Sequence, residues 1–276
     1  MTTTQIPAVT LNNGVSMPAL GFGLFKVDDD AIAGVVETAL TAGYRLFDTA
    51  PMYGNEKSLG DALHSSGLDR REFFVTTKIS NDDQGYGNTL AAFETSLQLL
   101  GMDYVDQVLI HWPVPNRGLY AETWAALSEV LSSGRARSIG VCNFDAAQLS
   151  VLIEATSVVP SVNQIEIHPL LQQPELLAHM RTLGITAQAW APLARGELLE
   201  NPVVEALARN HGVTPAQIVL RWHVQSGVVP IPKSSSAKRI TANADVFEFE
   251  LSVEDMARLT ELNIDHRTGP HSDDVR

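Results

Sequence analysis

The sequence has a single cysteine, Cys142, among its 276 residues. One thiol cannot form an intrachain disulfide or supply a zinc or iron–sulfur site built from several cysteines, so these are excluded. No apolar run approaches the length of a membrane span, and the amino-terminal MTTTQIPAV lacks the basic and apolar regions of a signal peptide. We therefore expect a cytoplasmic protein that has no membrane as a partner.

Positive charge is scarce in this chain. It has 19 Lys and Arg residues against 32 Asp and Glu residues, which gives a formal net charge of −13. Such a surface repels phosphate backbones, so we expect no nucleic-acid partner and no anionic membrane partner. With 45% hydrophobic and 18% charged residues, the composition is typical of a folded globular protein rather than of a disordered chain.

The chain also lacks a proline-rich or serine-rich linker, which predicts one domain over residues 1–276. What recurs is an apolar or β-branched run, then a polar turn, then apolar residues at helical spacing that end near a glycine such as Gly43, Gly101 or Gly184. The spacing of about 30 residues is the length of a strand–helix unit. Eight runs have this pattern: 19–24, 44–49, 72–78, 105–111, 136–141, 161–167, 184–190 and 227–233.

Alternation of strands and helices predicts an α/β protein with a mostly parallel sheet, either doubly wound or closed. Eight units without a linker favour the closed (β/α)8 TIM barrel. A doubly wound dinucleotide domain would carry G-x-G-x-x-G after its first strand, but Gly21-Phe22-Gly23 is followed by no third glycine. Asn13-Gly14, between two β-prone runs, predicts an amino-terminal hairpin that caps the barrel floor.

In such barrels the chemistry lies at the carboxyl ends of the strands. Asp48, Lys78 and His111 end the second, third and fourth predicted strands, and Tyr53 lies in the loop after the second. Taken singly, each has a structural explanation: Asp48 and Lys78 as a buried ion pair, His111 as a core histidine, Tyr53 as a loop aromatic. Their convergence at one face favours a catalytic site instead.

These four side chains can deliver a proton to an oxygen. A nearby ammonium lowers the pKa of a phenol, so we expect Lys78 to lower the pKa of Tyr53 and make it a proton donor. Asp48 would keep Lys78 charged, and His111 would orient a carbonyl oxygen. The set lacks an electron source, which a reduced nicotinamide would supply.

Seven segments resemble the aldo-keto reductases, in order and over nearly the whole chain. They are GYRLFDTAPMYGNE (43–56), FFVTTK (73–78), VLIHWP (108–113), RSIGVCNF (137–144), VNQIEIHP (162–169), AWAPLARG (189–196) and VVPIPKSSS (228–236). The segments WAPLARG and NADVFEFEL (243–251) are most similar to the bacterial 2,5-diketo-D-gluconate reductase-like subgroup. The resemblance implies a (β/α)8 barrel that reduces an aldehyde or ketone, including small dicarbonyls and keto-sugar acids, with NADPH.

The resemblance also implies roles for individual residues. Tyr53 would be the proton donor, Lys78 its partner, Asp48 the support of Lys78 and His111 the orienting group. Asn143 and Gln164 would bind the nicotinamide carboxamide, and Trp190 would stack on the ring. Lys233, Ser234 and Arg239 follow the eighth strand, where barrels bind phosphate, and would hold the 2′-phosphate. The full cofactor set is Gly23, Asp48, Asn143, Gln164, Trp190, Pro192, Leu193, Arg195, Gly196, Lys233, Ser234, Ser235, Arg239 and Asn243.

Three positions depart from the family pattern. Cys142 stands where a Ser is common, Ala242 where a Glu is common, and Ser80 where a Trp is common. We therefore expect weaker carboxamide and adenine contacts and a wider substrate pocket. Its walls would be Phe22, Tyr53, His111 and Trp112, and the tail over 265–276 would lie near the substrate mouth.

Two other functions are compatible with a barrel of this kind. A metal-dependent hydrolase would need clustered ligands, but the eight histidines include no His-x-His or His-Glu-x-x-His pair, so we expect no metal. A non-catalytic NADPH-binding or sensing protein would keep the cofactor site, although the intact catalytic residues argue against lost chemistry. The resemblance favours a monomer.

Overall fold

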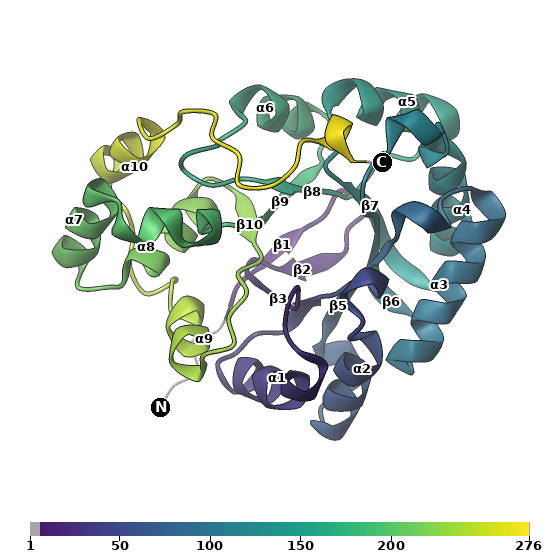
Figure 1. Cartoon of the computed structure of the whole chain (residues 1–276), viewed down its shortest axis with the longest axis horizontal. Coiled ribbons are helices and arrows are strands. Elements are labelled where there is room, and N and C mark those ends of the chain that lie inside the picture. The colour runs from purple at the N-terminus through teal and green to yellow at the C-terminus, as the bar shows by residue number, and fades with distance from the viewer. Residues whose placement is uncertain (1–5, 276) are drawn as a thin grey trace.

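The centre of the computed structural model, which describes residues 6–275, is a barrel of eight parallel strands (Figure 1). Each strand overlaps one of the eight predicted runs, and the predicted (β/α)8 fold is confirmed. The strands are β3 (Gly21–Gly23), β4 (Leu46–Asp48), β5 (Phe74–Ile79), β6 (Val105–Ile110), β7 (Ala136–Cys142), β8 (Val162–Glu166), β9 (Thr186–Trp190) and β10 (Val228–Pro230).

The barrel closes between its first and last strands. Each strand from β3 to β10 pairs in parallel with the next, and the backbone N–H of Gly23 donates to the carbonyl of Pro232 at 3.0 Å across the seam. A Cβ at Gly21 would lie 2.4 Å from Cδ1 of Ile231. The lack of a side chain at Gly21 therefore lets the two ends of the sheet approach.

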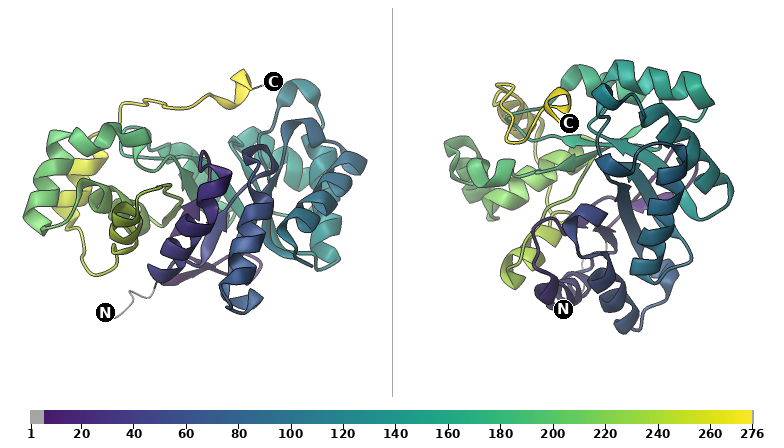
Figure 2. Two further views of the ribbon diagram at one scale, coloured as in Figure 1. Left: turned by 60° about the horizontal axis from the view of Figure 1, so that its bottom comes forward. Right: turned by 45° about the vertical axis from the view of Figure 1, so that its right-hand side comes forward.

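Helices surround the barrel, and the carboxy-terminal segment crosses one of its ends (Figure 2). As predicted, Gly43, Gly101 and Gly184 follow helices with φ of 99°, 63° and 70°, which glycine adopts without strain. The helices are α1 (Ile32–Thr41), α2 (Glu56–Ser65), α3 (Tyr86–Leu100), α4 (Tyr120–Ser132), α5 (Ala146–Thr156), α6 (Pro174–Thr182), α7 (Pro202–His211), α8 (Pro215–Gln225), α9 (Ala237–Ala244) and α10 (Val253–Thr260).

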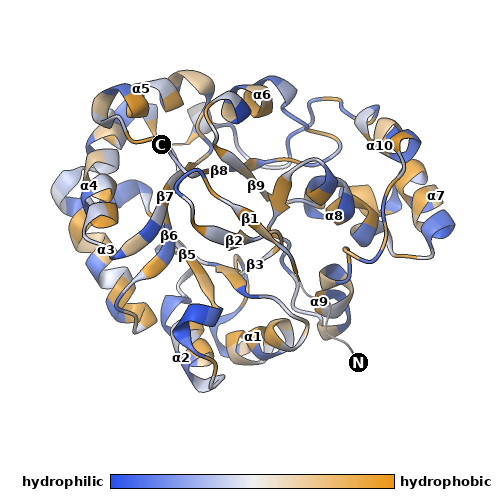
Figure 3. Ribbon diagram, turned by 180° about the vertical axis from the view of Figure 1, so that it is seen from behind, coloured by the Kyte–Doolittle hydropathy of each residue, from blue (hydrophilic) through white to orange (hydrophobic). Residues whose placement is uncertain are grey.

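The predicted hairpin closes the amino-terminal end of the barrel. Strands β1 (Ala8–Thr10) and β2 (Ser16–Pro18) pair antiparallel around Asn13-Gly14, and in the view from behind they lie across the barrel (Figure 3). Leu11 and Met17 are buried in one cluster with inward-facing strand residues such as Leu46 and Phe74. The hairpin therefore plugs the floor and leaves the carboxyl ends of the strands as the accessible mouth.

Strand side chains alternate between the barrel interior and a larger apolar layer beneath the helices. Leu46 and Asp48 point inward on β4, whereas Phe47 between them packs in the outer layer. The same alternation places Lys78 inside on β5. A polar side chain therefore reaches the mouth when it points inward and also lies at the carboxyl end of its strand.

No helix within residues 6–275 is long and apolar enough to cross a membrane.

We expect opposite effects on stability from alanine at two helical glycines. A Cβ at Gly60 of α2 would lie 2.2 Å from the carbonyl oxygen of Leu100, whereas a Cβ at Gly34 of α1 meets nothing within 4 Å. Gly60→Ala should lower the free energy of unfolding by about 1–3 kcal/mol through overpacking. Gly34→Ala should raise it by about 0.5–1 kcal/mol, because alanine is the better helix former. Urea unfolding measures both, and equal effects would contradict this packing.

Candidate active site

Lys78 lies at the centre of the polar group in the mouth. Its side chain is fully buried at the end of β5, where Nζ donates to Oδ1 of Asp48 at 2.6 Å and to the carbonyl of Thr49 at 2.9 Å. Burial alone would lower the pKa of Lys78, but the charge of Asp48 and its hydrogen bond, together with smaller contributions from Tyr53 and Cys142, outweigh burial and raise the pKa. Lys78 is therefore held as an ammonium ion.

Tyr53 lies beside this ammonium in the short 3-10 turn Pro51–Tyr53 that follows β4. Its ring centroid is 5.0 Å from Nζ of Lys78 and 5.9 Å from the ring centroid of His111. The structure therefore brings together all four residues proposed as catalytic, from three adjacent strand ends.

The expected low pKa of Tyr53 is wrong for this structure. Burial raises the pKa to about 12, and the opposing effect of Lys78 only partly offsets it. Tyr53 is therefore a protonated phenol at neutral pH, with a cation placed to stabilise its anion.

His111 follows β6 and is 8% exposed. Burial and the charge of Lys78 lower its pKa to about 3, so the imidazole is neutral. Its Nδ1 is buried and has no hydrogen-bond partner among the residues that the structure describes. A neutral imidazole with unused hydrogen-bonding capacity can orient a polar ligand without adding a charge.

Asn143, Gln164 and Trp190 lie around the same group: Asn143 follows β7, Gln164 lies within β8 and Trp190 ends β9. Gln164 Nε2 donates to Oδ2 of Asp48 at 2.8 Å. Asn143 Nδ2 donates to the carbonyl of His111 at 3.2 Å, and its Oδ1 accepts from Nε1 of Trp190 at 2.8 Å. The residues proposed to bind a nicotinamide are thus linked by hydrogen bonds to those proposed to transfer the proton.

The proposed phosphate residues lie after β10 at the start of α9. Ser234 is buried and its hydroxyl accepts from Nε of Arg239 at 3.2 Å. Lys233, Ser235 and Arg239 are exposed, and Asn243 is buried further along α9. Two exposed cations around a hydroxyl form a local positive site on a chain whose net charge is −13.

The segment after β9 has an unusual backbone. Ala191, Ala194 and Arg195 have φ of 46°, 48° and 53°, a region that residues with side chains rarely adopt, and Gly196 has φ of 106°. Pro192 is buried, Leu193 is half-buried and Arg195 is exposed. Such backbone strain is concentrated at functional loops, which fits the cofactor role that the resemblance implies.

The prediction that Phe22 lines the substrate pocket is wrong. Its ring is 1% exposed and packs edge-on against Tyr44 and Phe47 in the outer layer, with centroid distances of 5.3 and 6.4 Å. Phe22 points outward because Gly21 and Gly23 on either side of it take the inward positions of β3. Phe25, not Phe22, is the phenylalanine beside Tyr53: its half-exposed ring lies 5.1 Å from that of Tyr53.

Trp112, also expected in the substrate wall, lies beside the cofactor residues. Its ring centroid is 6.4 Å from that of Trp190, at an interplanar angle of 60°. Ser80 is half-buried after β5, and Cys142 is buried at the end of β7. Within residues 6–275 no group of three or more His, Cys, Asp or Glu side chains is arranged to hold a metal ion.

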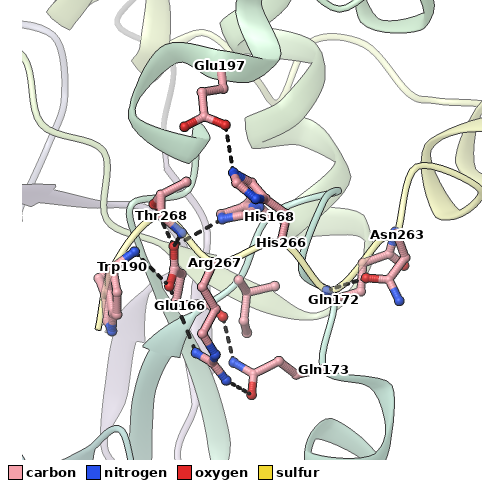
Figure 4. A network of polar contacts seen from close by, with 12 residues as sticks. Glu166, His168, Gln172, Gln173, Trp190, Glu197, Asn263, His266, Arg267 and Thr268 are labelled. Carbon is pink, nitrogen blue, oxygen red and sulfur yellow. Dashed lines mark hydrogen bonds and ion pairs between the residues drawn. The ribbon is translucent and has the colours of Figure 1, made fainter. Parts of the chain in front are cut away.

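Glu166 is a second carboxylate at the mouth, and it is not among the site residues predicted from the sequence. It ends β8 and is fully buried, and it accepts hydrogen bonds from the carboxy-terminal tail (Figure 4). The sequence does contain a feature that indicates Glu166 as a site residue: it is an acidic residue at the inward end of a predicted barrel strand, as Asp48 is. Its partner, Thr268, lies 102 residues away and could not be inferred from local pattern.

Comparison with known proteins shows the family to which this chain belongs. The family model described as the Aldo/keto reductase family matches residues 19–264. The chain is 46% identical to glyoxal reductase of Bacillus subtilis, over 100% of this chain and 99% of that protein. It is 47% identical to morphine 6-dehydrogenase of Pseudomonas putida, over 98% and 95% of the two chains. A variant of Gox0644 solved in complex with NADPH has a TM-score of 0.94 at 42% identity, covering 98% of each chain.

This chain therefore belongs to the aldo/keto reductase family.

The buried histidines should make stability depend on pH. Burial lowers the pKa of His111 to about 3 and that of His223, inside α8, to about 4, both from an ordinary 6.5. Below pH 6.5 the unfolded chain binds protons that the folded chain does not. The free energy of unfolding should therefore fall as pH decreases from 6.5 toward 4, by up to about 1.4 kcal/mol per pH unit for each histidine.

Urea unfolding between pH 6.5 and 5 tests this, since most carboxylates are still ionised there. His223→Gln should flatten the dependence. An unchanged slope in this variant would mean that His223 binds its proton equally in both states.

Proposed function

We propose that this oxidoreductase reduces an aldehyde or ketone to the alcohol with NADPH, with Tyr53 as the proton donor. One observation carries the proposal. The buried ammonium of Lys78, paired with Asp48 at 2.6 Å, lies 5.0 Å from the ring of Tyr53, and neutral His111 lies against the same ring. This arrangement suits delivery of a proton to an oxygen at the barrel mouth.

NADP(H) is the cofactor, and the residues present fit it. Trp190 offers an indole at the mouth, while Asn143 and Gln164 offer amides already oriented by their neighbours. Lys233 and Arg239 supply positive charge beside the buried hydroxyl of Ser234, which suits a phosphate dianion. When bound, the reduced nicotinamide supplies the hydride that the carbonyl carbon receives.

The protein's own residues handle the proton. His111 donates a hydrogen bond to the carbonyl oxygen and orients it toward Tyr53. The phenol O–H bond of Tyr53 breaks as its proton moves to that oxygen, which has gained the negative charge. Lys78 stabilises the resulting tyrosinate by its charge, and Asp48 fixes the lysine in place. A proton from water then restores the phenol.

For the substrate, we propose small dicarbonyls and keto-sugar acids, in line with the 2,5-diketo-D-gluconate reductase-like subgroup. Glyoxal reductase of Bacillus subtilis is named for a small dicarbonyl and is similar over the full chain. Half-buried Ser80, at the position where the family pattern commonly has a Trp, favours a wider and more polar pocket. Tyr53, His111, Trp112 and Phe25 would form its walls.

A non-catalytic NADPH-binding protein is not favoured, because such a protein has no need of a buried Lys78 ammonium held against a protonated phenol. We retain as proposals a single domain over residues 1–276, a monomer and a cytoplasmic location. We also retain the absence of a nucleic-acid partner, which the formal charge of −13 supports.

Tyr53→Phe removes the transferable proton and should lower kcat for carbonyl reduction by about 10²–10⁴-fold. NADPH oxidation followed by absorbance, with an α-dicarbonyl and a simple aldehyde, measures it. Tyr104→Phe is the matched control, because Tyr104 lies under Arg70 near the start of β6, away from the mouth. Near-normal turnover in Tyr53→Phe would show that another group is the acid.

Lys233→Ala should raise the KM for NADPH about 10–100-fold, because a hydrogen bond to a charged group contributes about 1.5–3 kcal/mol. The KM for NADH, which lacks the 2′-phosphate, should change little. Lys238→Ala provides the control, as another exposed lysine of the same region. A KM for NADPH that stays at the wild-type value would refute the phosphate assignment.

A further inference from the structure

Glu166 is a buried carboxylate whose partners come mainly from the other end of the chain. Its Oε1 accepts from the backbone N–H and the hydroxyl of Thr268 at 2.7 and 2.5 Å, and from Nε2 of His168 at 3.2 Å. Its Oε2 accepts from the backbone N–H of Gly269 at 3.3 Å. Figure 4 shows the carboxylate between Thr268, His168 and Arg267.

This carboxylate is ionised although water does not reach it. Burial would raise the pKa of Glu166, but the hydrogen bonds from His168 and Thr268 outweigh burial and lower it. Hydrogen bonds to a buried charge are stronger than neutral ones, and each donor that is lost leaves the charge less compensated. Glu166 therefore fixes the backbone of Thr268 and Gly269 at one place over the mouth.

The segment so fixed touches Trp190. A Cβ at Gly269 would lie 2.4 Å from Cη2 and 2.9 Å from Cζ3 of this indole, so the tail backbone lies directly against the outer edge of the six-membered ring. The opposite edge is held by Nε1 of Trp190, which donates to Asn143 at 2.8 Å. The indole is thus held at both edges, by the tail and by Asn143.

The tail also has attachments that do not involve Glu166 or Trp190. The backbone N–H groups of Ile264 and His266 donate to the carbonyl of Leu170, and His266 pairs with half-exposed Glu197 at 2.9 Å. These contacts dock residues 264–266 beside α6 and the loop after β9. Glu166, in contrast, binds Gly269, the residue that meets Trp190, and Thr268 directly before it.

We propose that Glu166 is a positioning residue for the cofactor: by holding Thr268 and Gly269, it sets the tail against Trp190 and fixes the indole plane on which the nicotinamide stacks. The inference rests on the proposed function, because it takes Trp190 as the stacking residue. Glu166 does not touch the reacting atoms, and its effect reaches the cofactor through Gly269 and the indole.

Three variants of the full-length chain test it, with NADPH affinity measured by calorimetry and amide exchange measured across the tail. Glu166→Gln keeps the size of the side chain but removes its charge. Thr268→Val removes one donor, and Gly269→Ala adds a methyl group that meets the indole. Each should raise the Kd for NADPH, by about tenfold for Glu166→Gln, and Glu166→Gln should speed exchange at Thr268 and Gly269. If Glu166→Gln does not fold, the two tail variants carry the test.

Two controls separate positioning from general destabilisation. Asp106→Asn alters another fully buried carboxylate, which pairs with Arg70 and Arg137 near the start of β6, and should leave the Kd unchanged. Gly34→Ala adds a methyl group in open space and should do the same.

Trp190→Ala separates the two proposals. If it leaves the Kd for NADPH unchanged, the stacking assignment in the proposed function fails. If Trp190→Ala weakens binding, Glu166→Gln should add little in that background, because both act through the same ring. Faster tail exchange in Glu166→Gln with an unchanged Kd would overturn the positioning role, as would an equal effect with and without the indole.

Discussion

The buried ion pair of Asp48 and Lys78 is the interaction on which the site depends. Removing an ammonium from water costs several kcal/mol, and only a close carboxylate with further hydrogen bonds compensates it. Asp48 provides this with Oδ1, while its Oδ2 accepts from Gln164, so one carboxylate fixes both the lysine and a proposed nicotinamide ligand. The same desolvation keeps Tyr53 a phenol and His111 neutral. Within this one buried group of side chains, Lys78 is thus an ammonium ion, Tyr53 a phenol and His111 a neutral imidazole.

The barrel makes this group possible by closing on itself. Parallel strands that pair all the way round bring the ends of β4, β5 and β6 to one rim, and the hairpin of β1 and β2 blocks the opposite rim. Charges at the mouth can then be buried by their neighbours rather than by a partner molecule. Glu166 repeats the arrangement two strands further on, with donors from the tail in place of a lysine.

Much of the fold and site could be predicted from residues alone. The eight apolar runs at regular spacing have a local physical cause, because each strand and helix needs a buried face of its own. All eight runs form strands of the barrel. Asp48, Lys78 and His111 were placed at strand ends by position, and Tyr53 by the adjoining loop. The prediction for Phe22 fails because β3 has only three residues and both of its end residues are glycines, so its side chains show almost no alternation. Phe25, just beyond that strand, is therefore the aromatic neighbour of Tyr53.

The sequence by itself determined the order of the strand–helix units, their number and the residue types at the strand ends, because these follow from local periodicity and turn chemistry. Only the tertiary structure decided how deeply those residues are buried, which reversed the expected direction of the Tyr53 pKa. It alone decided that Thr268 and Gly269 meet Glu166 and Trp190. Both outcomes depend on contacts between residues far apart in the chain, and desolvation is a property of the packed surroundings rather than of any residue or its sequence neighbours.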